Sequence, residues 1–248
     1  MGMIDASLNY SDKIVSVIGG SSGIGNATAQ AFRSRGAQVH VTGTRAHADD
    51  YSKDEGSDLE GLHFAQVDAA DDSAIAAYRQ KFDRLDVLIC SQGMVLYKRQ
   101  EFEPENFAKV IQVNLNSLMA FAGQFYDLLK AAQGSMIIVS STAAFHATVG
   151  NPAYNASKTG AMGLTRTLGK AWAPDGIRVN GIAPGLIATK MTAVTTQNPK
   201  RRDATIANIP VGRIGDPDDM AGLSLFLASP LARYVVGQTL IADGGLLL

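Results

Sequence analysis

The sequence has few of the features that mark several classes of protein. Its 248 residues contain one cysteine, Cys90, which excludes an internal disulfide and fits a reducing cytoplasm. The 22 basic residues are balanced by 23 acidic ones, and the one notable basic run is residues 200–202, so there is no electrostatic footprint for nucleic acid. No apolar run approaches the ~20 residues that span a bilayer, so no membrane partner is expected.

Further absences narrow the choice of protein class. Residues 1–10 have no basic stretch followed by an apolar core, so no secretory signal peptide is expected and a cytoplasmic location is predicted. The four histidines show no metal-ligand spacing, which predicts no metal site. No proline- or serine-rich linker, internal repeat or break in composition divides the chain, so we expect one domain over residues 1–248.

A glycine-rich turn follows the first expected strand. Residues 13–18 are largely β-branched and predict a strand, the turn runs from Gly19 to Gly25, and a helix over 26–35 ends at Gly36. In this context a glycine turn binds a dinucleotide, because glycines let the backbone approach a pyrophosphate and the helix start offers free N–H groups. The alternative is a plain turn between strand and helix.

The second expected strand, residues 37–43, ends where a dinucleotide enzyme reads the adenosine ribose. A carboxylate there bonds the 2′-hydroxyl of NAD, whereas an arginine suits the 2′-phosphate of NADP. The sequence has Thr44 and Arg45 and no acid before Asp49, so NADP(H) is favoured and NAD(H) stays possible. Arg45 can equally be a solvated loop residue.

The rest of the chain alternates between expected strands and helices. Further strands are expected over residues 61–67, 86–90, 136–140, 176–182 and 238–242. Helices are expected over residues 71–82, 104–130, 156–172 and 216–227, whereas 46–60 carry six acids and too little apolar periodicity for a full crossover helix. Such alternation predicts a parallel sheet with helices on both faces.

Two segments between these elements are candidates for function. Asp68 follows the third strand, and it either bonds the adenine amino group or caps the helix over 71–82. Residues 186–209 have mixed polarity and read as a long irregular stretch, which is usually functional, so we interpret them as a mobile substrate lid.

A second motif carries the chemistry. Tyr154 and Lys158 are four residues apart and share one face of a helix. A free phenol titrates near ~10 and each pKa unit corresponds to ~1.4 kcal/mol, so a phenolate at neutral pH needs about 4 kcal/mol of support. One cation at ~4 Å in an effective dielectric of ~20 supplies about that much. Ser141, at a strand end, is placed to hold a substrate oxygen. Asn114, in the apolar face of 104–130, makes a structural bond or belongs to a site.

These residues give the chain a family resemblance. It resembles the short-chain dehydrogenase/reductase family in Gly19-x-x-x-Gly23-x-Gly25, then Asn114, Ser141, Tyr154 and Lys158 in this order. Further matches are Asp68, Pro184-Gly185, residues 213–217 and residues 237–245, so the resemblance covers essentially the whole chain. It implies a Rossmann-type doubly wound parallel sheet of about seven strands, assembled as a homotetramer or a homodimer.

The resemblance also implies roles for single residues. Tyr154 would be the acid/base, Ser141 would orient the carbonyl or alcohol oxygen, and Asn114 would help to hold a proton-relay water. Lys158 would bond the nicotinamide ribose and lower the tyrosine pKa, and Ile187 would touch the carboxamide through its backbone. The cofactor contacts expected from motif and resemblance are Gly19, Ser21, Ser22, Gly23, Ile24, Gly25, Thr44, Arg45, Asp68, Ala69, Ser91, Gly93, Tyr154, Lys158, Pro184, Gly185, Ile187 and Thr189.

The sequence departs from the family pattern in two places. Ile18 stands where the family usually has threonine, which puts one turn-supporting hydrogen bond in doubt. Cys90-Ser91-Gln92-Gly93 replaces the common Asn-Asn-Ala-Gly, which changes contacts beside the adenosine ribose while Gly93 keeps the close backbone approach.

The predicted function is an NAD(P)(H)-dependent oxidoreductase that interconverts a ketone or aldehyde and an alcohol. Its substrate would suit a 3-oxoacyl reductase, a secondary alcohol dehydrogenase or a carbonyl reductase, in a pocket formed by Met94, Val95, His146 and Thr148. The alternatives are a nucleotide-binding sensor without activity, and a dehydratase or epimerase on the same scaffold. The C-terminal Leu246-Leu247-Leu248 indicates a subunit contact.

Overall fold

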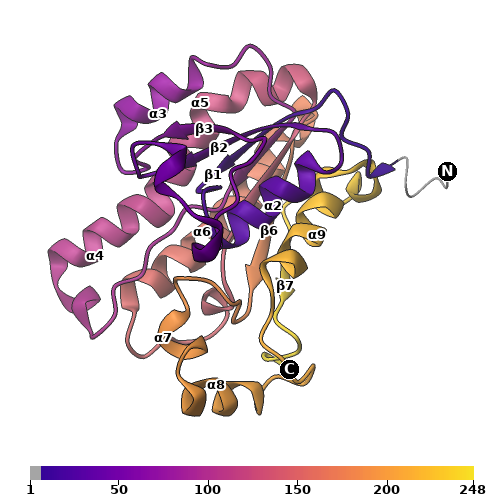
Figure 1. The fold of residues 1–248 in the computed structure, drawn as a ribbon. Coiled ribbons are helices and arrows are strands. Elements are labelled where there is room, and N and C mark those ends of the chain that lie inside the picture. Colours follow the sequence, from indigo (N-terminus) through magenta and orange to yellow (C-terminus); the bar gives the residue numbers. More distant parts are fainter. Residues whose placement is uncertain (1–6) are drawn as a thin grey trace.

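The chain is built on one seven-stranded sheet, shown in Figure 1 for this computed structural model, which describes residues 7–248. The strands follow the order β3-β2-β1-β4-β5-β6-β7, and every neighbouring pair is parallel. Their bounds are β1 (Ile14–Ile18), β2 (Gln38–Gly43), β3 (His63–Gln66), β4 (Val87–Cys90), β5 (Ser135–Val139), β6 (Arg178–Pro184) and β7 (Thr239–Ala242). The order reverses between β1 and β4, where a crevice opens at the carboxyl ends of the strands.

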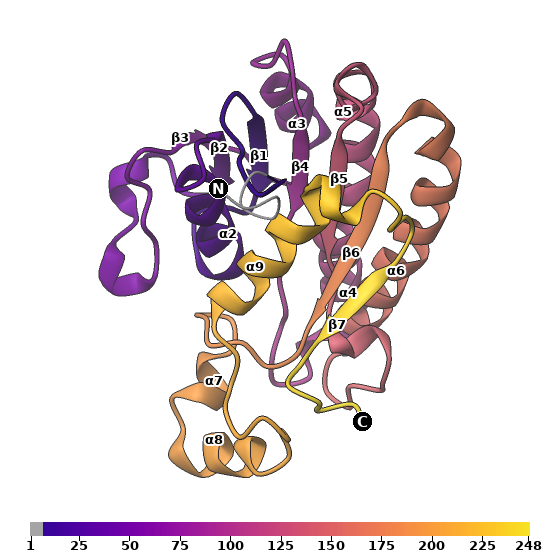
Figure 2. The same cartoon turned by 90° about the vertical axis from the view of Figure 1, so that its right-hand side faces the viewer.

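Helices cover both faces of the sheet. They are α2 (Gly23–Arg33), α3 (Asp72–Arg79), α4 (Pro104–Ile111), α5 (Ser117–Ala132), α6 (Pro152–Trp172), α7 (Ala193–Thr196), α8 (Pro199–Ile206) and α9 (Pro217–Ala228). Two of them, α2 and α9, pack together on one face, and α3, α5 and α6 cover the other (Figure 2). Side chains of β1 alternate between the two faces. Val15 and Val17 pack in the core under α2 and α9, whereas Ile14 and Ile18 pack in the core under α3, α5 and α6. The predicted fold class is confirmed.

The predicted helix over 104–130 is interrupted near its middle. After α4 the chain makes a π turn over Gln112–Asn116 and continues as α5. A π turn inserts a residue into the helical register and is common at functional sites. It places Asn114, 1% exposed, toward the interior instead of on a continuous helix face.

Segment 186–209 differs from the prediction of irregular chain. It contains α7 and α8, which stand away from the sheet in both views (Figures 1 and 2). Asn198 caps α8 by accepting a hydrogen bond from the Arg201 backbone N–H at 3.1 Å, and Pro199 takes the first helical position. The sequence signal for this helix was present in Asn198-Pro199, but it lacks an apolar face, so periodicity did not indicate it.

Two smaller expectations are settled by local hydrogen bonds. Residues 46–60 form only the short 3-10 turns Ala48–Asp50 and Lys53–Glu55, as predicted. The alternative that Asp68 caps the next helix is wrong, because Asp71 caps α3 by accepting from the backbone N–H of Ser73 and Ala74. Within residues 7–248 the structure has no helix of the length and apolarity that crossing a membrane requires.

Candidate active site

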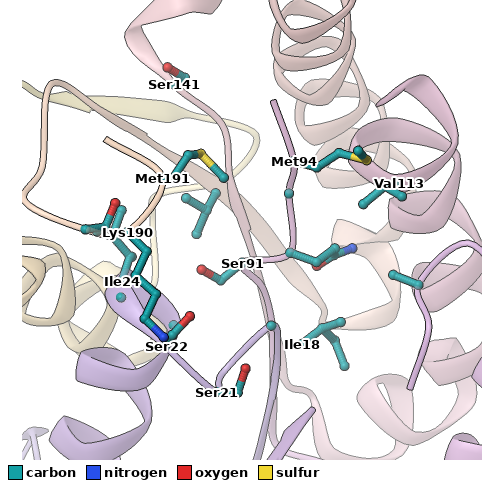
Figure 3. A pocket seen from close by; sticks show the side chains of 18 of the residues that line it. Ile18, Ser21, Ser22, Ile24, Ser91, Met94, Val113, Ser141, Lys190 and Met191 are labelled. Atoms are coloured by element: carbon teal, nitrogen blue, oxygen red, sulfur yellow. The ribbon is translucent and has the colours of Figure 1, made fainter. Parts of the chain in front are cut away.

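A cavity of about 500 Å³ lies at the carboxyl edge of the central strands. It is lined by the glycine turn, the ends of β2, β4 and β5, the start of α6 and the chain after β6. Figure 3 shows Ser141 at one end, Ser21 and Ser22 at the other, and Met94 and Met191 on opposite sides between them. All predicted catalytic and cofactor-binding residues line this cavity except Arg45 and Asn114. Lining residues that sequence reasoning missed include Gln92, Lys109, Val113, Lys190, Met191 and Thr192.

The turn after β1 needs its glycines for conformation and for space. Gly19 and Gly23 have φ of +72° and +54°, a region that other residues rarely adopt. A Cβ at Gly20 would lie 2.7 Å from a methyl carbon of Val41 and 2.8 Å from the Val17 carbonyl oxygen. Ser22 caps α2 without a side-chain hydrogen bond, so backbone N–H groups of the first turn remain for an anionic ligand. The turn therefore fits a dinucleotide pyrophosphate.

The hydrogen bond put in doubt by Ile18 is replaced from a neighbouring strand. The backbone N–H of Gly19 donates to the hydroxyl of Thr42 at 3.0 Å, and Thr42 is 2% exposed at the end of β2. The hydroxyl that supports the turn thus comes from the next strand of the sheet. At the other departure, burial raises the pKa of the Cys90 thiol to about 12, so this cysteine is an inert core residue.

The adenosine end of the cavity carries a cluster of charges. Arg45 lies outside the cavity lining, where its guanidinium pairs with Glu55 at 3.0 Å and stacks over the Tyr51 ring at 4.7 Å. Lys190 lines the cavity and pairs with the same Glu55 oxygen at 2.7 Å. Hydrogen bonds from Lys190 and Arg45 lower the pKa of Glu55. Asp68 lines the same region and accepts a hydrogen bond from the Ala70 N–H at 2.9 Å.

At the other end, β5 and α6 bring Ser141, Tyr154 and Lys158 together. Ser141 follows β5, its hydroxyl accepts the Ala143 backbone N–H at 3.1 Å, and its side chain lowers the pKa of the Tyr154 phenol. Lys158 is 4% exposed, lies 5.6 Å from the centre of the Tyr154 ring and donates to the Val139 carbonyl at 2.9 Å. The predicted helical spacing therefore puts the tyrosine and the lysine on the face that lines the cavity.

The electrostatics of this group differ from the expectation. Burial raises the pKa of Tyr154, and although the hydrogen bond of Ser141 lowers it, Tyr97 and Glu101 add to the increase. Burial alone lowers the pKa of Lys158 to about 8. The expectation that the lysine makes the phenol acidic counted the cation and left out the loss of solvent around both groups, which is the largest cause of the pKa shift of each. The phenol is a neutral proton donor near pH 7.

Asn114 anchors the chain after β4 to α6. Its amide oxygen accepts from the Met94 N–H at 2.8 Å, and its amide nitrogen donates to the Met94 carbonyl at 2.9 Å and to the Ser157 hydroxyl at 3.1 Å. The structural bond that the sequence left open is therefore made. A Cβ at Gly93 would lie 3.5 Å from the Lys158 Nζ and 3.6 Å from the Asn114 Oδ1, which is ordinary van der Waals contact, so Gly93 lies directly beside both groups.

The residues expected around the substrate are only partly at the cavity. Met94 lines it, whereas Val95, His146 and Thr148 do not. The His146 ring contacts the Thr142 carbonyl through Nδ1 at 2.9 Å and takes no part in the lining.

The fold and the cavity together define an α/β enzyme of the dinucleotide-binding class. A family model described as enoyl-(acyl carrier protein) reductase matches residues 18–247. The chain is 34% identical to 2-dehydro-3-deoxy-D-gluconate 5-dehydrogenase of Bacillus subtilis, over 99% of this chain and 98% of that one. It is 32% identical to a 3-oxoacyl-[acyl-carrier-protein] reductase of Vibrio cholerae, over 96% and 99% of the two chains.

A solved structure is similar over the same length. It is a putative NAD(P)-dependent gluconate 5-dehydrogenase from Beutenbergia cavernae with bound NADP, 31% identical with a TM-score of 0.87, and the match covers 97% of this chain and 99% of that one. The chain therefore belongs to the short-chain dehydrogenase/reductase family, and the prediction of an oxidoreductase acting on a CH–OH group or its carbonyl is confirmed.

Proposed function

We propose that the protein transfers a hydride reversibly between NADP(H) and a secondary alcohol or its ketone. The observation that carries this proposal is that Ser141, Tyr154 and Lys158 share one cavity with the glycine turn. The nicotinamide supplies or accepts the hydride when it is bound. In the reductive direction Ser141 and Tyr154 hold the carbonyl oxygen, and Tyr154 releases its proton as the alkoxide forms. The buried ammonium of Lys158 then stabilises the phenolate.

The preference for NADP(H) is supported by charge at the adenosine end. No carboxylate stands at the tip of β2 to meet a ribose 2′-hydroxyl, and Arg45 and Lys190 supply two cations near that tip. Their partner Glu55 is about half exposed, so its ion pairs are weak and a 2′-phosphate can compete for the cations. The NADP bound by the Beutenbergia cavernae protein agrees with this preference.

An Arg45→Gln variant is expected to bind NADPH about tenfold more weakly and NADH about equally well, because only NADPH presents a phosphate to the guanidinium. Fluorescence titration of both cofactors measures the two dissociation constants. Arg202→Gln, an exposed change on α8, is the matched control and is expected to bind both as the parent does. Equal losses for NADPH and NADH would contradict the assignment.

Segment 186–209 is proposed as the substrate lid. Residues 189–192 line the cavity, and Tyr97 from the chain after β4 donates its hydroxyl to the Met191 carbonyl at 2.6 Å. The segment is thus joined to the chain after β4 by a hydrogen bond that must break for the segment to open. Met94 and Met191 give the space between them an apolar, adaptable lining.

Two apolar surfaces support assembly into a homotetramer. On α4 and α5, Phe107 and Met119 are 37% and 47% exposed, and on the β7 edge and C-terminus, Ile241 and Leu248 are 45% and 107% exposed. Two separate apolar faces allow two kinds of subunit contact, which suits a tetramer, whereas a single apolar face suits a dimer. Light scattering after size exclusion measures the mass of the assembly.

A cytoplasmic location is proposed for the protein, since the Cys90 thiol is free.

The function is tested by NADPH oxidation with a panel that contains 3-oxoacyl thioesters, keto derivatives of sugar acids and simple ketones. Turnover with any of them supports the proposal, and the relative kcat/KM values name the substrate class. Cofactor binding without turnover would favour a nucleotide sensor, and product formation without net cofactor oxidation would favour a dehydratase or an epimerase.

A further inference from the structure

Glu101 is a completely buried carboxylate beside the proposed active site. It is 0% exposed, its Oε1 accepts the Leu96 backbone N–H at 3.0 Å, and its Oε2 accepts the Tyr154 backbone N–H at 2.8 Å. It forms no ion pair with a lysine, arginine or histidine of residues 7–248. A carboxylate is expensive to bury unless hydrogen bonds replace its water, so two backbone donors hold it in place.

One of its bonds caps α6 from a distant part of the chain. Tyr154 is the third residue of α6, and the first N–H groups of a helix have no partner within it. Asn151, at the capping position, makes no capping bond, because its side-chain amide donates to the Leu96 carbonyl at 2.9 Å. Glu101 supplies the missing acceptor, and its charge is favoured at the amino end of a helix.

The other bond fixes the segment that reaches the lid. Both backbone polar groups of Leu96 are bound, the N–H by Glu101 in the 3-10 turn Gln100–Phe102 and the carbonyl by Asn151 just before α6. The next residue, Tyr97, donates its hydroxyl to the Met191 carbonyl. Lys98 follows with a φ of +58° and Arg99 with +62°. Such left-handed residues are strained and persist only where the surrounding structure holds them, and the Glu101 bond to Leu96 lies next to them in the chain.

We propose that Glu101 is a positioning residue, whose buried carboxylate holds the proton-donating tyrosine and the lid anchor Tyr97 in one arrangement. The proposal rests on the proposed function of Tyr154 and goes beyond it. Glu101 touches no reacting atom, since it does not line the cavity. It acts through the backbone of Tyr154 and through its negative charge.

The negative charge of Glu101 predicts the direction in which the pKa of Tyr154 changes when that charge is removed. The polar and charged groups that act on the Tyr154 phenol are Ser141 after β5 and Tyr97 and Glu101 on the chain after β4, and the Lys158 ammonium of its own helix lies 5.6 Å from the ring centre. Glu101 contributes to raising the pKa of Tyr154, so its neutralisation lowers that pKa. Reduction requires the protonated phenol, and its rate falls as pH rises through the pKa. The alkaline limb of kcat therefore moves to lower pH when the charge is removed.

The test replaces Glu101 by glutamine. The amide keeps one oxygen acceptor, but its NH₂ group then faces the second backbone N–H, so one of the two hydrogen bonds is lost. Glu101→Gln is expected to lower kcat for ketone reduction about tenfold or more, to shift its alkaline limb to lower pH and to leave NADPH affinity within about twofold. Hydrogen exchange at Leu96 and Tyr154 is expected to speed up about tenfold in the same variant. Glu105→Gln, an exposed change on α4, is the matched control and is expected to leave all four quantities unchanged.

A wild-type kcat and pH profile in Glu101→Gln would overturn the proposal, as would a lower kcat with an unmoved alkaline limb, which marks a merely structural role. If Glu101→Gln does not fold, Glu101→Asp keeps the charge with a shorter reach. It is expected to have a lower kcat with the alkaline limb of the parent, and an unchanged kcat would overturn the proposal. If the parent itself has no turnover, the proposed function fails, and the hydrogen exchange at Leu96 and Tyr154 alone decides on Glu101.

Discussion

Replacing Tyr154 by phenylalanine is expected to lower kcat by about a thousandfold while NADPH affinity stays within about twofold. The change removes one oxygen, and the ring keeps its packing over Lys158. The oxygen lost belongs to the phenol whose pKa the Ser141 side chain lowers, and Ser141 lies at the end of the cavity away from Ser21 and Ser22 of the glycine turn. General acid catalysis contributes ~10²- to 10⁴-fold, and here the same oxygen also positions the carbonyl, so a loss of about a thousandfold lies above the lower end of that range.

Steady-state kinetics with the best ketone of the panel, together with NADPH titration, measure both quantities. Tyr234→Phe is the control, because Tyr234 is 100% exposed and does not line the cavity. A near wild-type kcat in Tyr154→Phe would show that another group donates the proton. A parallel loss of NADPH affinity would show instead that the phenol serves the cofactor.

The fold and the reacting residues could be predicted because short-range patterns determine them. The β-branched run of β1, the glycine turn and the start of α2 are contiguous in sequence, so their geometry follows from local conformation alone. Tyr154 and Lys158 share one helix, and their spacing places them on one face. Such features need no knowledge of what packs against them.

Features that depend on tertiary contacts could not be predicted. Glu101 lies in a run of charged and polar residues that reads as a solvated surface, yet it is completely buried against the start of α6. Thr42 replaces the hydroxyl missing at position 18 from a neighbouring strand, and no spacing rule connects the two. The direction of the Tyr154 pKa depends on burial, which a sequence argument from one lysine and one phenol does not contain.

Replacing Lys158 by methionine is expected to abolish turnover and at the same time to stabilise the cofactor-free protein by about 1–2 kcal/mol at pH 7. Burial lowers the pKa of Lys158 to about 8, below the ordinary value of 10.5. The fold therefore disfavours the ammonium, and below pH ~8 the charged side chain lowers the free energy of unfolding by about 3 kcal/mol. Methionine removes this penalty but leaves the Val139 carbonyl without its donor, which costs about 1–2 kcal/mol in return.

The pH dependence separates this effect from better packing. Between the folded pKa of about 8 and the unfolded value of 10.5, the unfolded chain binds the proton that the native state has lost, so the stability of the parent rises with pH through this window. Lys158→Met lacks that rise, and the difference between the two proteins is expected to shrink or reverse by pH ~10. Subtracting the stability-versus-pH curve of the variant from that of the parent cancels the contributions of other groups that titrate in the same pH range.

Urea unfolding of both proteins across this pH range measures the difference, and Lys170→Met, an exposed change on the same helix, is the matched control. If Lys158→Met were less stable than the parent at every pH, the lysine would be a structural residue held by Val139 alone. The expected pattern is the opposite, because a buried ammonium that is bound to one carbonyl and faces a neutral phenol serves the reaction at the expense of the fold.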